Sequence, residues 1–355
     1  MNLLTSLPVA HLFFRHWHVD DTEVGVVVAK ARFGRAADGL FYAEAEAPDL
    51  ILSDVFAGDP ATTALVAEQD IAPGKMGTDV LVRGAAKAPG GEALADWPVG
   101  VAVRDAEGAD LLRWGFHVRG PTAWRRKGRG WRQMAAERVT EVPLDYALAY
   151  GGTLRDAEGA PSDFFAENPA GTGFATRAAL EGVEEWPAPQ IGELAEFMAV
   201  GGPEEAMALR GFGPVAKAWL PRRALAGTFD ETWERTRHPR MPLDYDLGFW
   251  NCAPTALQVR PFLRGDEVLV LDGMDPRPEP LVLPLPAAGM GLRLSGDAVA
   301  EAAMTLDTVV ADLTGEAPAL ELTWRALIPE PAAYDRAEIA AHALAAPAPH
   351  PVPAA

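Results

Sequence analysis

Turn signals recur along this chain at roughly 8–12-residue intervals, and they constrain its fold more than any other feature. Glycine and proline together supply many of these turns, with 34 and 31 occurrences in 355 residues. Between them lie short β-branched and apolar runs, such as VGVVVAKARFG over Val24–Gly34 and LELTWRAL over Leu320–Leu327. Long segments with helical periodicity are few. The pattern predicts a mainly β protein with sandwich-like antiparallel sheets and a few short helices.

Several local elements follow from the same reasoning. Val99–Asp105 and Leu111–Pro121 flank the loop AEGAD and predict a hairpin. Gly227–Arg237 predicts a short helix that Thr228 would cap. We expect one domain over residues 1–330, which could divide into lobes at about 1–155 and 156–330. Residues 331–345 are expected to form a terminal helix, and the Pro/Ala-rich residues 346–355 a disordered tail.

Composition excludes several classes of function. The 31 basic and 50 acidic residues give a net charge of −19, which disfavours nucleic acid and anionic lipid as partners. One cysteine excludes an internal disulfide framework and a multi-cysteine zinc site. No apolar run approaches the ~18 residues of a membrane span, and the first residues lack a basic signal-peptide region. We therefore expect a cytoplasmic protein without membrane insertion.

One short pattern occurs twice. Pro143–Tyr150 is PLDYALAY and Pro242–Phe249 is PLDYDLGF, which suggests a duplicated half-domain but is too short to establish one. Asp145 and Asp244 occupy equivalent places in the two copies. Aspartates after a proline commonly accept hydrogen bonds from backbone N–H groups in turns, so we interpret both as structural ties.

Other candidates for chemistry carry weaker signals. Cys252 in WNCAP has no histidine near it in sequence, which favours a buried structural thiol over a nucleophile. His16 and His18 would share one face of a strand, but no third metal ligand stands at a suggestive spacing. The glycine-rich stretches have no phosphate-binding form. We expect no catalytic residue, metal or cofactor; the rival is a hydrolase of a cell-envelope polymer that uses Asp145, Asp244 or Asp246 as acid and base.

A local basic island interrupts the acidic chain at WRRKGRGWRQM, Trp124–Met134. It is interpreted as a solvated hairpin with KGRG at its tip. The alternative is a patch that binds an acidic partner.

Seven motifs, taken in order, resemble a known bacterial family. They are KMGTDVLVRGAAKAPGG (Lys75–Gly91), PLDYALAYGG (Pro143–Gly152), NPAGTGF (Asn168–Phe174), GFGPVAKAWLPRR (Gly211–Arg223), GTFDETW (Gly227–Trp233), PLDYDLGFWNCAP (Pro242–Pro254) and LRGDE (Leu263–Glu267). Together they resemble the domain-of-unknown-function family 2169 over about residues 5–330. Met76 stands where that family usually has a proline.

The resemblance implies an adaptor or chaperone of the type VI secretion system without catalysis. Such a protein would bind an effector and help to load it onto the valine-glycine repeat (VgrG) spike or a PAAR-type tip. A structural component of the spike itself is a further alternative. We expect turns from several motifs to gather into one binding surface with aromatic anchors and charged neighbours. The candidate residues are Lys75, Thr78, Asp79, Arg119, Trp124, Trp219, Tyr245, Phe249, Trp250, Asn251 and Arg264. Pairing of an edge strand with an extended effector segment is a second mode.

Overall fold

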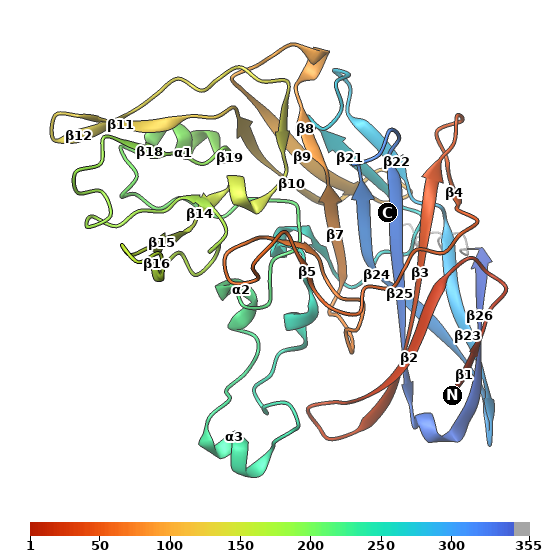
Figure 1. The fold of residues 1–355 in the computed structure, drawn as a ribbon. Helices are drawn as coiled ribbons and strands as arrows, with labels where there is room; N and C mark the ends of the chain where they lie inside the picture. The colour runs from red at the N-terminus through yellow and green to blue at the C-terminus, as the bar shows by residue number, and fades with distance from the viewer. Residues whose placement is uncertain (344–355) are drawn as a thin grey trace, which may run out of the picture.

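Two β-sheets dominate the computed structural model of the chain, which describes residues 1–343 (Figure 1). The larger sheet has ten strands and the smaller has five. Short sheets and loops are attached to one side of this framework. The prediction of a mainly β fold with mostly antiparallel sheets and a few short helices is confirmed.

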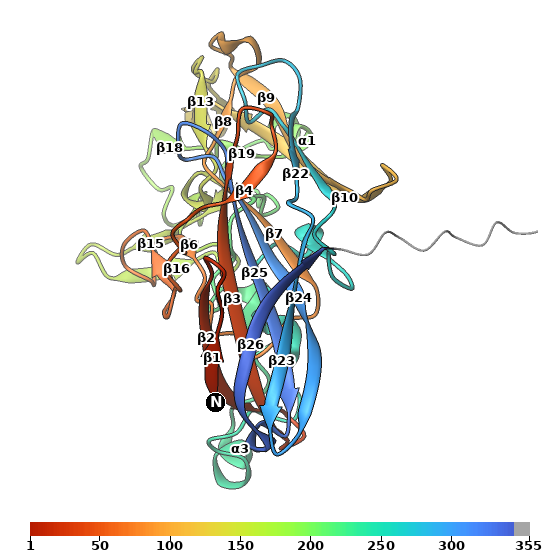
Figure 2. The ribbon, with the colours of Figure 1, turned by 90° about the vertical axis from the view of Figure 1, so that its right-hand side faces the viewer.

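The ten-stranded sheet curls toward a barrel. Its main strand order is β1-β26-β23-β24-β25-β3-β2, and β1 and β2 at the two ends of that order lie side by side (Figure 2). Its strands are β1 (Asn2–Leu4), β2 (Ala10–Trp17), β3 (Glu23–Arg35), β4 (Phe41–Ala43), β7 (Thr78–Arg83), β20 (Gln258–Val259), β23 (Ala288–Gly296), β24 (Val299–Asp312), β25 (Ala319–Pro329) and β26 (Tyr334–Ala343). The sheet thus draws on both ends of the described chain, and residue 155 does not divide its strands into two consecutive lobes.

Strand β24 changes partners along its length. Its first half pairs with β23, and its second half pairs in parallel with β7 on one side and antiparallel with β25 on the other. Asp307 lies at the change, because the register with β25 skips from Leu306 to Thr308. A bulge of this kind bends a strand and redirects the side chain of the extra residue.

The five-stranded sheet has the order β19-β10-β9-β21-β22. Its strands are β9 (Asp96–Arg104), β10 (Asp110–Arg119), β19 (Ile191–Gly192), β21 (Val268–Asp272) and β22 (Leu281–Pro284). The predicted hairpin around AEGAD is confirmed as β9 and β10. The smaller sheets are formed by β11 (Ala123–Lys127), β12 (Gly130–Gln133) and β18 (Glu185–Pro187), and by the pairs β8 (Ala85–Lys87) with β13 (Glu141–Pro143), β14 (Tyr150–Gly151) with β17 (Thr172–Gly173), β15 (Thr153–Arg155) with β16 (Pro161–Phe164), and β5 (Val55–Phe56) with β6 (Leu65–Ala67).

Helical structure is confined to short pieces. The α-helices of residues 1–343 are α1 (Leu194–Ala199), α2 (Leu220–Arg223) and α3 (Glu231–Thr236), and the 3₁₀ turns are η1 (Pro89–Gly91), η2 (Tyr146–Leu148), η3 (Leu247–Trp250), η4 (Thr255–Leu257) and η5 (Pro331–Ala333). The helix predicted near Gly227 exists as α3, but its cap is Asp230 rather than Thr228. The Asp230 carboxylate accepts a hydrogen bond from the Trp233 N–H, as N-cap aspartates commonly do.

The terminal helix predicted for residues 331–345 is wrong. Only η5 is helical there, and Tyr334–Ala343 forms β26, which lies between β23 and β1. Its alanines favour a helix locally, but tertiary pairing overrides such propensity. The tail predicted for residues 346–355 lies outside the described residues.

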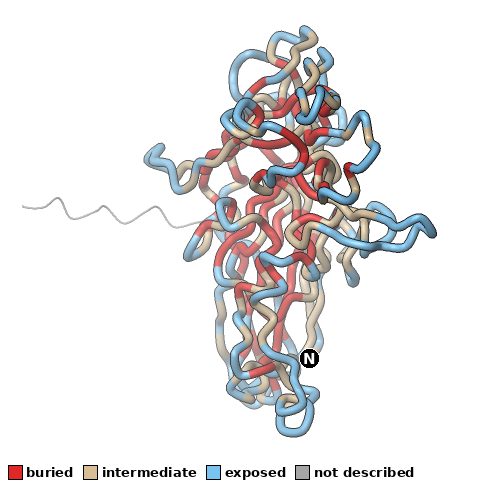
Figure 3. Tube along the Cα trace, turned by 90° about the vertical axis from the view of Figure 1, so that its left-hand side faces the viewer, coloured by how far each residue is buried: buried red, intermediate tan, exposed pale blue. Residues whose placement is uncertain are grey.

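A single large apolar cluster runs through both sheets. Strand β3 shows why: Val27, Ala29 and Phe33 join this cluster, whereas Val26 and Val28 on the opposite face pack in a second one. Figure 3 shows buried chain along the middle of the molecule and exposed chain at the projecting hairpins and loops. Buried charged residues, among them Asp79, Asp307 and Arg325, interrupt the apolar interior, and the candidate site lies there.

Candidate functional site

A row of polar side chains crosses the ten-stranded sheet. Register places Lys30 of β3 beside Thr323 of β25, Thr323 beside Thr308 of β24, and Thr308 beside Asp79 of β7. Successive residues of a strand point to opposite faces, so residues paired across the strands in this way share one face. The face is covered by the rest of the chain, and Asp79 at the end of the row is fully buried.

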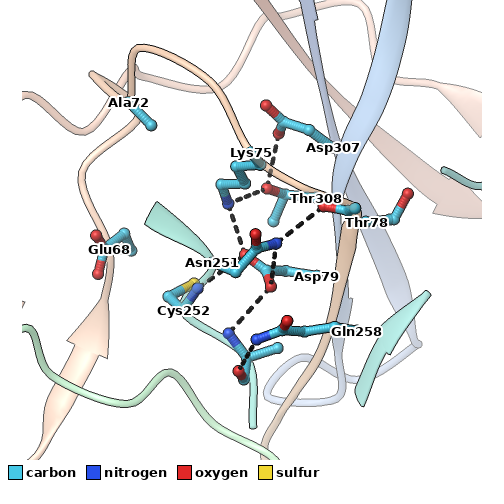
Figure 4. Close-up of polar contacts among 12 residues, drawn as sticks. Glu68, Ala72, Lys75, Thr78, Asp79, Asn251, Cys252, Gln258, Asp307 and Thr308 are labelled. Carbon is cyan, nitrogen blue, oxygen red and sulfur yellow. Dashed lines mark hydrogen bonds and ion pairs between the residues drawn. The ribbon is translucent and has the colours of Figure 1, made fainter. Parts of the chain in front are cut away.

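Asp79 forms the centre of a clasp between two distant motifs (Figure 4). Its carboxylate accepts hydrogen bonds from the backbone N–H groups of Cys252 and Ala253, at 2.9 and 3.2 Å. It also accepts from the Asn251 side-chain amide at 3.1 Å and from the Lys75 ammonium at 2.8 Å. Four donors therefore saturate a carboxylate that water cannot reach.

Asn251 completes the clasp from the other side. Its carbonyl oxygen accepts from the Met76 N–H at 2.9 Å, and its amide donates to the Gly77 carbonyl at 2.9 Å. Gly77 is required by close approach, because a Cβ atom there would lie 2.4 Å from the Val259 carbonyl oxygen. Asn251 thus fixes the backbone of Met76 and Gly77 through two hydrogen bonds.

Lys75 and Thr78 fasten the same turn to β24. The Lys75 ammonium donates to the Thr308 hydroxyl at 2.7 Å, and its side chain is only 4% exposed. Burial alone would lower the pKa of Lys75, but the charges of Asp79 and Asp307 and the hydrogen bond to Asp79 act together against it, and that pKa is raised. The Thr78 hydroxyl donates to the Leu306 carbonyl and accepts from the Leu263 N–H. All of these groups act as ties within the chain.

The bulge in β24 supplies a second buried ion pair. Asp307 accepts from the Arg325 guanidinium at 2.6 Å and from the Thr308 hydroxyl at 2.9 Å. Arg325 also donates to the carbonyl oxygens of Asp70 and Ala72. The bulge therefore connects the sheet to the segment that covers it.

A cavity of about 330 Å³ lies against this polar face. Its charged lining residues are four basic and four acidic: Lys30, Lys75, Arg83, Arg325, Glu68, Asp70, Asp145 and Glu321. Each already has a hydrogen-bond or ion-pair partner within the chain. Balanced and internally paired charges favour neither an anion nor a cation as a ligand.

Cys252 lies in the wall of this cavity, and its surroundings oppose thiolate formation. Burial raises the pKa of Cys252 well above its ordinary value, and the nearby Asp79 charge raises it further. A nucleophilic thiol needs the opposite shift and a base within reach, and histidine is missing from the residues that line the cavity. Cys252 therefore acts as a small buried side chain.

The first PLDY copy forms a separate clasp. Asp145 accepts from the Ala147 N–H at 2.8 Å and caps η2, so it ties a turn as expected. The buried amide of Asn168, from NPAGTGF, donates to the carbonyl oxygens of Tyr146 and Tyr150. The Tyr146 hydroxyl donates to the Gly213 carbonyl in GFGP. Three motifs thus hold one another in place.

The second PLDY copy is not structurally equivalent. Asp244 accepts from the Thr228 N–H and hydroxyl, at 2.9 and 2.7 Å, and so joins the GTF motif. In this copy the 3₁₀ turn η3 is capped by Asp246 and not by Asp244, since the Asp246 carboxylate accepts a hydrogen bond from the Gly248 N–H. In LRGDE the Glu267 carboxylate likewise ties a turn, because it accepts hydrogen bonds from the N–H groups of Arg264 and Gly265.

Seven of the predicted partner-facing residues are buried within the chain, which argues against direct contact of these seven with a partner. They are Lys75, Thr78, Asp79, Arg119, Trp124, Trp219 and Asn251. Arg119, for example, donates to the Pro189 carbonyl beneath α1, and its guanidinium lies 3.7 Å from the Phe197 ring centroid. Tyr245, Phe249 and Trp250 form a half-buried aromatic series, and Arg264 is exposed beside Asp266.

Sequence reasoning missed an exposed apolar region. Residues 227–245, here named the α3 protrusion, extend away from the sheets at one end of the molecule (Figure 1). Phe229 and Leu243 on it are 55% and 73% exposed, and Trp17 of the neighbouring β2 is 45% exposed. Arg240 bridges the two, because its guanidinium stacks 4.8 Å from the Trp17 ring and pairs with Asp21. The sequence signals this region only through isolated apolar residues, Phe229 and Leu243, within polar turns.

Arg222 was also missed. It forms a bidentate pair with Glu68 and donates to the Phe249 carbonyl, which joins α2, η3 and the segment after β6. Glu68 and Arg222 are far apart in sequence, and the motif GFGPVAKAWLPRR that contains Arg222 does not indicate its partner. Within residues 1–343, no group of three potential metal-ligating side chains gathers in one place.

Comparison with known proteins gives one match. A family model described as "Uncharacterized protein conserved in bacteria (DUF2169)" matches residues 20–325. No curated protein and no solved structure matches the chain. In the part of the chain that the structure describes, no helix is long and apolar enough to cross a membrane.

Proposed function

Because the chain belongs to the DUF2169 family of uncharacterized bacterial proteins, we propose that it is a non-catalytic adaptor of the type VI secretion system. In this proposal it works in the cytoplasm, binds an effector, and helps to load that effector onto the VgrG spike or a PAAR-type tip. The proposal takes its biological setting from the resemblance of the seven motifs to that family. The structure contributes an argument about what those motifs do.

The observation that carries the proposal is that the motif acids hold the chain's own turns. Asp79 is saturated inside a clasp, and Asp145, Asp244 and Asp246 accept hydrogen bonds from nearby backbone N–H groups. A hydrolase of an envelope polymer would need two such acids free to transfer protons to a substrate. A binding scaffold needs a rigid framework that displays other residues, which is what these ties favour.

The α3 protrusion is the surface that we assign to effector binding. Phe229, Leu243 and Trp17 present apolar area, and Arg240 lies among them. Aromatic and arginine side chains commonly supply most of the binding energy of protein interfaces. Hydrogen bonds from Arg237 to the Val19 carbonyl and the Asp21 carboxylate fix the protrusion to the turn after β2. The apolar side chains are thereby held in place before a partner arrives.

Co-purification from the native host tests the proposal. The tagged parent is compared with a Phe229→Ser/Leu243→Ser variant and with a matched Val282→Ser/Val299→Ser control, whose two valines are exposed elsewhere. We expect the parent and the control to recover an effector with spike or tip proteins, and the protrusion variant to lose the effector. Recovery of none of these by the parent under several growth conditions would contradict the adaptor function.

Cell fractionation separates the adaptor from a spike component. An adaptor stays in the cells while the effector appears in the secreted fraction. Appearance of this chain in the secreted fraction along with the spike would support the structural alternative instead.

A further inference from the structure

The β11–β12 hairpin is a basic feature of an acidic protein. Residues 119–138 contain seven lysines and arginines and one glutamate, a net charge of 7 − 1 = +6. Since the whole chain carries −19, the remainder carries −19 − 6 = −25. The hairpin, here residues 123–133, projects from the body on the side opposite the ten-stranded sheet (Figure 1).

The register of the hairpin separates an anchoring face from a charged face. Trp124 pairs with Gln133 and Arg126 with Trp131, and these side chains turn toward the body. Trp124 is buried, and Trp131 lies between Gly202 and the Arg126 guanidinium, which is 4.1 Å from its ring centroid. The anchored tryptophans hold the hairpin in one orientation.

The charged face keeps an arrangement that folding alone does not favour. Arg125 and Arg132 lie directly opposite each other, and like charges in cross-strand pairs are destabilising. Glu185 of β18 compensates Arg125 at 2.8 Å. Among the described residues, no acid pairs with Lys127, Arg129 or Arg132, and all three side chains are exposed. Three positive charges therefore stand together at the hairpin tip.

We propose that this hairpin tip binds an acidic segment of a partner polypeptide. Opposite charges across an interface steer association and select partners. Nucleic acid fits less well, because Trp124 is buried and Trp131 is packed against Gly202 and the Arg126 guanidinium, which leaves no hairpin ring free for base stacking. The inference does not depend on the type VI secretion assignment, since it concerns only the chemistry of the partner.

Fluorescence anisotropy with a labelled peptide of repeating Glu-Glu-Gly units tests this inference on the full chain. The hairpin variant carries Lys127→Glu, Arg129→Glu and Arg132→Glu. The control carries Arg223→Glu, Arg293→Glu and Arg336→Glu at exposed positions elsewhere, so that both variants change the net charge equally, by −6. We expect the parent to bind the peptide less tightly as salt rises, the hairpin variant to bind about tenfold more weakly, and the control to match the parent.

Three results would overturn the proposal: no binding by the parent at low salt, equal weakening in both variants, or tighter binding of oligothymidylate than of the peptide. Circular dichroism checks that each variant is folded. If the triple variant fails to fold, Arg129→Ser at the tip removes a single charge and is expected to weaken binding about twofold to threefold. Unchanged affinity of that variant would also refute the proposal.

Discussion

Replacement of Asp79 by asparagine tests the clasp most directly. The variant Asp79→Asn keeps the size of the side chain and removes its charge. Lys75, whose side chain is 4% exposed, would then hold a buried ammonium without a counter-charge. All four partners of Asp79 are hydrogen-bond donors. The NH₂ group of the new asparagine would therefore face donors and could not accept their hydrogen bonds.

The expected loss is large. Removal of one partner from a buried ion pair costs about 3–5 kcal/mol, and each buried donor left without an acceptor costs about 1–3 kcal/mol. Native domains are stable by only about 5–15 kcal/mol. We therefore expect Asp79→Asn to lower the free energy of unfolding by at least about 3 kcal/mol.

Urea unfolding followed by tryptophan fluorescence measures this change, since the chain has 10 tryptophans. The midpoint should fall while the slope m stays constant. Asp244→Asn is the matched control, because Asp244 occupies an exposed turn and its partner Thr228 is exposed as well. Its loss should stay below about 1 kcal/mol.

A double-mutant cycle identifies the cause. The variant Lys75→Met/Asp79→Asn removes both charges, so it should be more stable than Asp79→Asn alone by about 0.5–3 kcal/mol. The reasoning would be refuted if Asp79→Asn unfolded within about 1 kcal/mol of the parent, or if Asp244→Asn were equally destabilising.

Three further predictions concern the same region. Gly77→Ala should destabilise the fold by about 1–3 kcal/mol because its Cβ would overlap a backbone carbonyl oxygen, whereas Gly130→Ala, with open space around it, should have little effect in the same urea assay. Cys252 should react with a thiol reagent only after unfolding, since burial raises the pKa of its thiol; rapid labelling of the native protein would contradict its placement. Acid should weaken the fold through Glu68. Burial alone would raise the pKa of Glu68, but the ion pair with Arg222 holds that pKa below the ordinary 4.5. The stabilisation from this ion pair is therefore present above pH 4.5 and is lost as the pH falls through the lower folded-state pKa. Urea midpoints measured across that range should therefore fall, and Glu68→Gln should flatten the dependence.

Local patterns identified the elements that local chemistry determines. The hairpin of β9 and β10 follows from alternation around a glycine turn, and Asp145 caps its turn as an aspartate after proline commonly does. Strand β26 shows the limit. Its alanine-rich sequence favours a helix, but hydrogen bonding to β23 and β1 decides its conformation, and neither neighbour is visible in the local sequence.

Burial was the property that the sequence predicted least well. Lys75 and Asp79 are polar residues on either side of the turn at Gly77, a position that normally indicates exposure. They are buried because they pair with each other and because residues far along the chain complete their hydrogen bonds: Asn251 donates to Asp79, and Thr308 accepts from Lys75. The reverse holds for Phe229 and Leu243, which are apolar but have no neighbouring element to cover them.

The pairing of β7 with β24 has a consequence for synthesis. During translation, Thr78–Arg83 leave the ribosome long before Val299–Asp312 exist, yet β24 is the main strand beside β7 and carries Thr308, which accepts a hydrogen bond from Lys75 in the turn before β7. Pairings between such distant segments form slowly, and chains that wait for them expose unpaired edges. The amino-terminal part of this protein therefore has to remain incomplete until the last strands emerge, and loss of the carboxyl-terminal strands would remove support from its most deeply buried charges.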